Sequence, residues 1–208
     1  AGIDGALLLG QAGMEAGNAL ADVLTGKVSP SGHLTDTWAK KYEDNPASAT
    51  FGSNDGDNLQ EDYVEDIYVG YRYFDTFDVE PLYPFGYGLT YSDCVIDEIQ
   101  PEKEYTYEDA VKDGIEIKVH VENRGSYDTE EVLQGYVKVQ SPNEVLHPKL
   151  GVFARIHIKA GEGQWISLHI SKTAFSTVTE DGERVYDGKK AQIFIGFGQP
   201  DERTAELL

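Results

Sequence analysis

The sequence predicts a mixed fold, in which a partial α/β layer is followed by an all-β sandwich. In the first 26 residues, an apolar run, a glycine loop and a pattern with helical period follow one another, as in an α/β layer. In the second half of the chain, short alternating segments are separated by turn residues. The 22 glycines and 13 tyrosines among 208 residues also favour a protein rich in β-structure.

The α/β part is predicted from residues 1–38. The run at 6–9, Ala-Leu-Leu-Leu, lies between glycines, as expected of a central parallel strand that is buried on both faces. A helix is predicted next, ending at a left-handed cap at Gly26. Its apolar face consists of Ala16, Ala19, Leu20, Val23 and Leu24. The turn Pro30-Ser31-Gly32 then leads into a second expected strand at 34–38.

Residues 40–62 form a polar stretch with neither a helical nor a strand period. Its Asn-Asp-Gly-Asp-Asn cluster at 54–58, near Glu61 and Asp62, suggests calcium binding as one alternative. The order of these residues differs, however, from the D-x-[DN]-x-[DN]-G loop of calcium-binding hands. We therefore predict a solvated surface loop.

Residues 63–91 are dense in aromatic side chains and connect the two parts of the chain. Their second half, 81–91, cannot be helical, because it contains two prolines that lack a backbone donor and two glycines that admit positive φ. We expect a stiff connector. Its aromatic rings are suited to stacking on sugars, but packing between two domains is the favoured role, because such rings bury large areas.

From residue 92 onward the pattern is that of short β-strands. Between 115 and 122, isoleucine and valine alternate with charged or polar residues, which predicts a strand with one buried and one wet face. Further strands are predicted at 94–99, 132–139, 152–158, 164–170 and 192–198. This regular spacing is typical of a two-sheet, immunoglobulin-like sandwich.

The formal net charge is −20 at pH 7, from 37 acidic and 17 basic residues. This charge argues against nucleic acid or an anionic membrane as a partner, since phosphate groups bind to cationic surfaces. The single cysteine, Cys94, excludes an intrachain disulfide, which fits a reducing compartment and favours the cytoplasm. We find neither a signal-peptide pattern nor an apolar run as long as a membrane span.

Two motifs in the aromatic segment resemble those of family 3 glycoside hydrolases. In that family, Y-x-E-x-I-Y-V-G-Y-R-Y-x-D is followed by P-L-Y-P-F-G-Y-G-L-S-Y at the end of an α/β sandwich domain. The first motif is matched by Tyr63, Glu65, Ile67, Tyr68, Val69, Gly70, Tyr71, Arg72, Tyr73 and Asp75. The second is matched at 81–91, with Thr90 in place of serine.

The resemblance continues on both sides of these motifs. Residues 13–34 follow the family's G-x-E-x-G-x-A-L-A-D-V-L helix and P-S-G-x-L turn. Residues 121–137 and 148–162 resemble the fibronectin type III-like domain that often closes these proteins, with departures at Thr129 and Val152. The resemblance implies the end of an α/β sandwich domain with a polar loop at 1–62, an aromatic junction at 63–91 and a fibronectin type III-like β-sandwich at 92–208.

The resemblance also implies retaining hydrolysis, which needs two carboxyl groups about 5 Å apart. In the family the nucleophile is an Asp of a separate (β/α)8 barrel, and the acid/base of many members is a Glu upstream of the matched helix. Neither carboxylate can be carried over to this chain, so we predict no catalytic residue and no activity of the chain alone. The implied partners are a barrel of the same parent chain and a carbohydrate substrate bound by the parent enzyme.

Four residues are candidates for a substrate-side or domain-junction role, namely Glu65, Tyr68, Arg72 and Asp75. Glu65 and Arg72 are expected to pair or cap within the junction. No cofactor or metal is predicted, since the five histidines lack ligand spacing. Four of them are explained by outward strand positions, namely His120, His147, His157 and His169.

The preferred function is thus the non-catalytic portion of a β-glucosidase-like hydrolase. The alternative is a stand-alone carbohydrate-binding or adhesive β-sandwich module.

Overall fold

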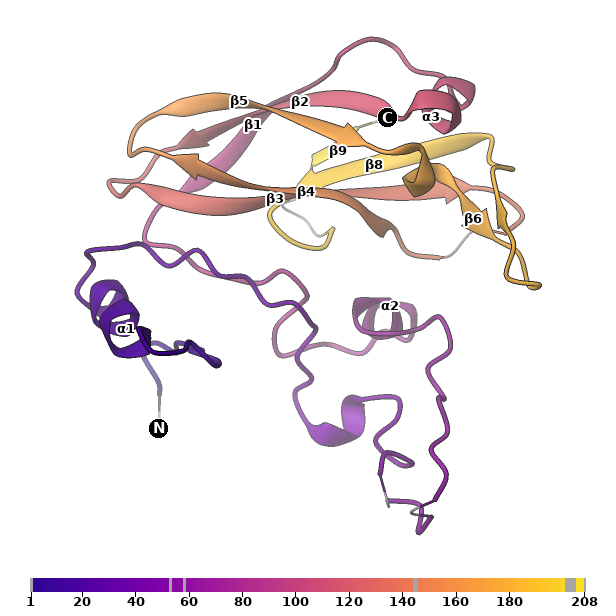
Figure 1. Ribbon diagram of the computed structural model, residues 1–208, viewed down its shortest axis with the longest axis horizontal. Coiled ribbons are helices and arrows are strands. Elements are labelled where there is room, and N and C mark those ends of the chain that lie inside the picture. The colour runs from indigo at the N-terminus through magenta and orange to yellow at the C-terminus, as the bar shows by residue number, and fades with distance from the viewer. Residues whose placement is uncertain (1, 53, 58, 144–145, 201–204, 208) are drawn as a thin grey trace.

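The structure is a computed structural model that describes residues 2–52, 54–57, 59–143, 146–200 and 205–207. The helices are α1 (Ala16–Leu24), α2 (Tyr71–Thr76) and α3 (Tyr107–Asp113), with short 3-10 helices η1 (Tyr42–Asp44) and η2 (Lys172–Phe175). The strands are β1 (Cys94–Pro101), β2 (Ile115–Asn123), β3 (Thr129–Gln140), β4 (Lys149–Ile158), β5 (Gly163–Ile170), β6 (Thr177–Val178), β7 (Arg184–Val185), β8 (Lys190–Gly196) and β9 (Ala205–Leu207). The protein is therefore mostly sheet with few helices, as Figure 1 shows.

The strands form one sheet of order β1-β2-β5, a second of order β4-β3-β8-β9 and a small β6-β7 pair. All of the pairings are antiparallel. The two larger sheets contribute to a single hydrophobic core. Every strand predicted between 94 and 198 is present, with ends displaced by a few residues.

The alternation in β2 explains how one sheet serves both the core and the solvent. Ile117, Val119 and Val121 are fully buried, while Lys118 between them is exposed. Each such side chain contributes about 1.5–3 kcal/mol when it leaves water. The hydrophobic pattern thus fixes the register of β2, because a slip by one residue would expose all three side chains.

Helix α3 closes one end of this core and was not predicted. Its first turn is fixed by a capping box, in which Asp109 N donates to Thr106 Oγ1 at 3.1 Å and Thr106 N donates to Asp109 Oδ2 at 3.0 Å. Gly114, with φ of 78°, ends the helix. The Tyr107 hydroxyl then donates to the carbonyl oxygen of Phe175 at 2.7 Å, which ties α3 to η2.

The α/β part differs from the prediction. Helix α1 forms and Gly26 has the left-handed φ of 73°, as expected, but no residue of α1 is buried. The predicted strand at 6–9 is wrong: these residues form no strand and are exposed, Leu8 to 65%. A parallel strand needs a neighbour to satisfy its backbone groups, and the described chain pairs none with it.

The second predicted strand of this part, at 34–38, is also wrong as a strand. It is reduced to one antiparallel bridge between Trp38 and Tyr83. The loop at 40–62 contains η1 and turns. No helix in the described ranges is long and apolar enough to cross a membrane.

Candidate functional site

The aromatic junction packs on the outer face of the four-stranded sheet. In Figure 1, α1, η1 and α2 lie on the side of β3 and β4, away from β5. Tyr136 of β3 is fully buried, and its ring meets that of Tyr71 edge-on, with centroids 6.1 Å apart. Tyr71 in turn lies 5.7 Å from Phe85, so three rings connect β3, α2 and the connector at 81–91.

Two polar anchors fix these rings. The Tyr136 hydroxyl donates to Gln134 Oε1 at 2.7 Å, and the Tyr71 hydroxyl donates to the carbonyl oxygen of Pro148 at the same distance. A β-bulge between Gly135 and Tyr136 shifts the β3–β4 register at this point. The aromatic cover explains why β3 is buried on both faces around Tyr136.

The two glycines of the connector allow backbones to meet. Gly86 has φ of 78°, and a Cβ there would lie 2.7 Å from Gly198 Cα. A Cβ on Gly88 would lie 2.4 Å from the carbonyl oxygen of Gly32. Larger residues are therefore excluded unless the backbone moves. Phe85 N also donates to Gln199 Oε1 at 3.2 Å, so the connector contacts both the sandwich and the N-terminal segment.

Residues 34–38 run alongside the connector at 81–91 and are joined to it by backbone hydrogen bonds. Leu34 N donates to Tyr87 O at 2.8 Å and Trp38 N donates to Tyr83 O at 2.8 Å. In the other direction, Gly86 N donates to Leu34 O at 2.9 Å. These bonds hold the N-terminal part to the junction without any regular strand.

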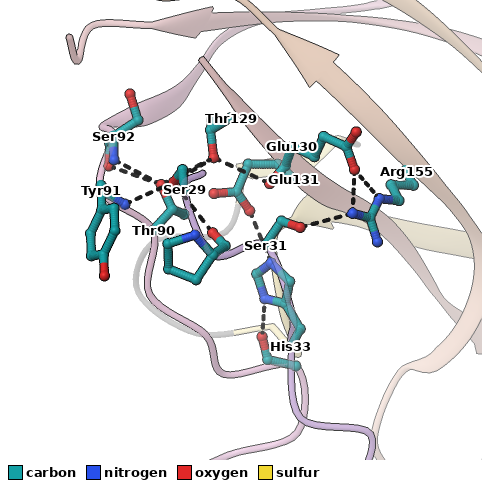
Figure 2. A network of polar contacts seen from close by, with 12 residues as sticks. Ser29, Ser31, His33, Thr90, Tyr91, Ser92, Thr129, Glu130, Glu131 and Arg155 are labelled. Atoms are coloured by element: carbon teal, nitrogen blue, oxygen red, sulfur yellow. Dashed lines mark hydrogen bonds and ion pairs between the residues drawn. The ribbon is translucent and has the colours of Figure 1, made fainter. Parts of the chain in front are cut away.

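A buried ion pair links this N-terminal segment directly to β3, as Figure 2 shows. His33 Nδ1 lies 2.8 Å from the carbonyl oxygen of Gly86, and His33 Nε2 lies 3.0 Å from Glu131 Oε2. The Gly86 carbonyl and an ionised Glu131 carboxylate both accept, so this geometry suits the imidazolium form of His33, in which both ring nitrogens donate. The side chains of His33 and Glu131 are only 8% and 5% exposed.

The pKa of His33 reflects this enclosure. Burial lowers it, but the hydrogen bonds to Glu131 and to the Gly86 carbonyl, together with the Glu131 charge, outweigh burial and raise the pKa above 6.5. The positive charge of Arg155 lowers the pKa of His33. The charged form of His33 is thus favoured in the folded protein.

Hydroxyl groups and an arginine extend the network on both sides of this pair (Figure 2). Tyr91 N donates to Ser29 Oγ at 3.0 Å, and Thr129 Oγ1 lies 3.2 Å from Ser29 Oγ and 3.3 Å from Thr90 Oγ1. Arg155 pairs with Glu130 and donates to Ser31 Oγ at 2.8 Å. The start of β3 and the middle of β4 therefore hold residues 29–33.

The four predicted site residues all lie in or next to α2, and they do not converge on one point. Tyr68 packs edge-on against Phe77 at 5.5 Å. Glu65 accepts the backbone N–H of Tyr68 through its carbonyl oxygen at 2.8 Å. The expected pairing of Glu65 with Arg72 is not found: within the described ranges no ion pair joins them. Arg72 instead lies beside the Tyr71 hydroxyl.

Asp75 reaches the sandwich through Gln199, which follows β8. Gln199 Nε2 donates to its two carboxylate oxygens at 3.3 and 3.4 Å. Burial raises the pKa of Asp75, while nearby His147 and the Gln199 hydrogen bond act in the other direction. His147 was expected on a strand, but it lies in the bend before β4, and its Nε2 is buried without a hydrogen-bond partner.

Sequence reasoning assigned no role to His33 or Glu131, although they form the best-enclosed ionic contact of the site. A signal was present, since a histidine directly after the Pro-Ser-Gly turn is not explained by a strand face. In the parts of the chain that the structure describes, no group of three His, Cys, Asp or Glu residues is arranged to hold a metal ion. Asn58, from the alternative calcium cluster, lies outside the described residues.

The arrangement can hold domains together but offers little for chemistry. The ionic pair is too enclosed to meet a substrate, and burial raises the pKa of the Cys94 thiol to about 12, so this sulfur is not a thiolate at neutral pH. Fold and site together define a β-sandwich with an N-terminal region fastened to one of its sheets.

The family of this region follows from comparisons with known proteins. Residues 1–91 match the model of the glycosyl hydrolase family 3 C-terminal domain. Across 79% of its length, the chain is 36% identical to the thermostable β-glucosidase B of Acetivibrio thermocellus, covering 21% of that protein. Across 81% it is 36% identical to a β-glucosidase of Kluyveromyces marxianus, covering 19% of it.

Solved structures agree. β-Glucosidase 3B from Thermotoga neapolitana in complex with α-D-glucose aligns with a TM-score of 0.80 and 30% identity, over 96% of this chain and 27% of that one. A GH3 β-glucosidase of Bifidobacterium adolescentis aligns with a TM-score of 0.78 and 30% identity, over 92% and 28%. Residues 1–91 belong to the glycosyl hydrolase family 3 C-terminal domain, and the chain spans about a fifth of the length of the curated relatives it matches.

Proposed function

We propose that this chain is the non-catalytic portion of a retaining, β-glucosidase-like glycoside hydrolase and that it supports the catalytic domains of its parent. The observation that carries the proposal is the N-terminal region, which exposes an apolar surface while it is fastened to the sandwich. Leu7, Leu8 and Leu9 are exposed, and α1 has no buried residue. Contiguous exposed apolar surface of this kind marks an interface.

The proposed occupant of that interface is the rest of an α/β layer. The run at 6–9 has the sequence of a strand buried on both faces, so neighbouring strands would satisfy its backbone and cover its leucines. In this proposal the parent also supplies the (β/α)8 barrel with the nucleophile, and a carbohydrate substrate binds there. Glu65, Tyr68, Arg72 and Asp75 then have domain-junction roles, which their contacts around α2 support.

We further propose that residues 92–208 form a fibronectin type III-like domain. In support, a three-stranded and a four-stranded antiparallel sheet share one core, as in that class of sandwich. The domain would give the junction a rigid base, because Tyr136, Glu131 and Arg155 all project from its four-stranded sheet.

The first test is hydrolysis of an aryl β-glucoside. The purified 208-residue chain is expected to show no turnover above the rate without protein, since neither catalytic carboxylate is assigned to it. Acetivibrio thermocellus β-glucosidase B, with its matching segment deleted, is expected to lose activity. The same enzyme with this chain fused in place of that segment is expected to recover it.

Turnover by the isolated chain would contradict the proposal. Full activity of the deleted relative would contradict it as well, because the segment would then support nothing. If the fusion is insoluble, the deleted enzyme alone still decides between these outcomes.

A further inference from the structure

The outer face of the three-stranded sheet carries a tryptophan that takes no part in the junction described above. Trp165 of β5 is 46% exposed and points away from the core, as the alternation of burial along β5 shows. In Figure 1, α1 and α2 lie beyond β3 and β4, on the opposite side of the sandwich. This face is therefore free of the N-terminal region.

The Trp165 indole is held in place from one side. It lies opposite His120 in the β2–β5 register, and the two rings are 5.1 Å apart with an angle of 49° between them. His120 Nδ1 forms a 2.6 Å hydrogen bond with Asp97 Oδ1. The imidazole also lies close to Gly163, where a Cβ would come within 2.8 Å of it. The ring that supports the indole is thus fixed before any ligand arrives.

An irregularity in β1 brings two carboxylates to the side of this support. The β1–β2 register shifts between Ile96 and Glu98, which leaves Asp97 as the additional residue in β1. Asp97 follows the core-facing Ile96, so it points to the outer face, where it reaches His120. Because of the register shift, Glu98 pairs with His120 and lies on the same face. A regular strand would point Asp97 and Glu98 to opposite faces.

Hydrogen-bonding groups lie next to the indole. Lys118 and Ser167 form the next outward pair in the β2–β5 register, two residues along each strand and hence about 6.6 Å away. Both are exposed. In the described ranges, neither side chain takes part in a hydrogen bond or ion pair, so their donors are available to a ligand.

We propose that Trp165, supported by His120, is a stacking platform for one sugar ring of a neutral β-linked gluco-oligosaccharide, with Lys118 and Ser167 bonding to its hydroxyls. A pyranose offers an apolar C–H face to an aromatic ring and hydroxyls at its edge. A neutral ligand fits because Asp97, Glu98 and Glu122 lie on this face and the chain has a net charge of −20, which repels anions.

The choice of a glucoside rests on the proposed function, since the relatives are β-glucosidases. The position of the platform, on the face away from the junction, does not depend on the proposed function. A site there holds a longer glucan close to the parent enzyme without taking part in the reaction.

The experiment titrates the 208-residue chain with β-1,4- and β-1,3-linked gluco-oligosaccharides. Tryptophan fluorescence is read in a Trp38→Phe background, where Trp165 is the only tryptophan, and calorimetry is run on the unchanged chain. We expect saturable binding with Kd on the order of 1 mM. Trp165→Ala is expected to weaken it by at least about tenfold, because a tryptophan anchor supplies much of such binding energy.

The matched control is Phe153→Ala, which removes a 68% exposed ring from β4 of the other sheet and should leave the affinity unchanged. Thermal melts verify that each variant is folded. If Trp165→Ala does not fold, Lys118→Ala and Ser167→Ala take its place, and each is expected to weaken binding several-fold.

Equal affinity of the Trp165→Ala variant, or no saturable binding of either sugar series by the unchanged chain, would overturn the platform. The stacking platform and the proposed function can be refuted independently of each other. Lost sugar binding with an active fusion enzyme refutes only the platform, and an inactive, folded fusion with intact binding refutes only the proposed function.

Discussion

Replacing Tyr136 with alanine is expected to lower the free energy of unfolding by about 3–5 kcal/mol, the usual range for deleting a large buried aromatic side chain. Tyr136 is fully buried between β3 and α2, where it meets the Tyr71 ring. The substitution opens a cavity at the base of the junction and leaves Gln134 Oε1 without its 2.7 Å donor. Chemical denaturation of the 208-residue chain, followed by circular dichroism, measures the change.

Two further variants serve as controls. The first removes only the hydroxyl of Tyr136, and the second removes an aromatic ring that lies outside the junction. Tyr136→Phe removes only the hydrogen bond to Gln134 and should cost about 0.5–1.5 kcal/mol. Phe153→Ala, on the exposed side of β4, should change stability little. A loss for Tyr136→Ala as small as that for Phe153→Ala would show that the junction does not pack on β3.

Replacing His33 with alanine is expected to cost about 3–5 kcal/mol, because it leaves the Glu131 carboxylate buried without its partner. The double variant that also carries Glu131→Ala should cost less than the sum of the single variants, since no unpaired charge is left behind. Lys27→Ala is the control. It breaks the 2.9 Å pair with Asp22 at a side chain that is 71% exposed, so it should cost at most about 1 kcal/mol.

The ion pair between His33 and Glu131 makes the free energy of unfolding depend on pH. His33 has a raised pKa in the folded state, so the folded protein holds this proton more tightly than the unfolded chain does. The resulting stabilisation is complete below pH 6.5 and is lost as the pH rises through the folded pKa, which lies above 6.5. The difference in unfolding free energy between the unchanged chain and His33→Gln should shrink over that window, and a constant difference would contradict the assignment of His33 as an imidazolium.

The sandwich was predictable because its own residues determine it. Strict alternation in β2 marks a strand with one buried face, and β2 finds both of its neighbours within this chain. Helix α3 was missed although Thr106 and Asp109 have capping-box spacing, because the helix is short and no long periodic pattern supports it.

The strand predicted at 6–9 failed for the opposite reason. Its leucines predict burial on both faces, but burial of a parallel strand depends on neighbouring strands, and the described part of the chain places none beside it. Helix α1 forms nonetheless, because its hydrogen bonds are internal. Local pattern was sufficient for the helix and insufficient for the strand.

At the junction, the motifs gave the location and the structure gave the contacts. The glycines at 86 and 88 could be recognised as positions of special backbone freedom, yet the partners that require them, Gly198 and Gly32, are distant in sequence. The same holds for the ion pair, whose members are 98 residues apart. Spacing along the chain carries no information about contacts of this kind.

Hydrogen exchange tests most directly whether the N-terminal segment is fastened to the junction. The amides of Leu34, Trp38 and Gly86 donate to carbonyls across the junction, so they should exchange about as slowly as the edge strands of the sandwich. They should also exchange faster in the His33→Ala variant. Exchange at these three amides as fast as at the exposed loop residues 55–57, in the unchanged chain, would contradict the account.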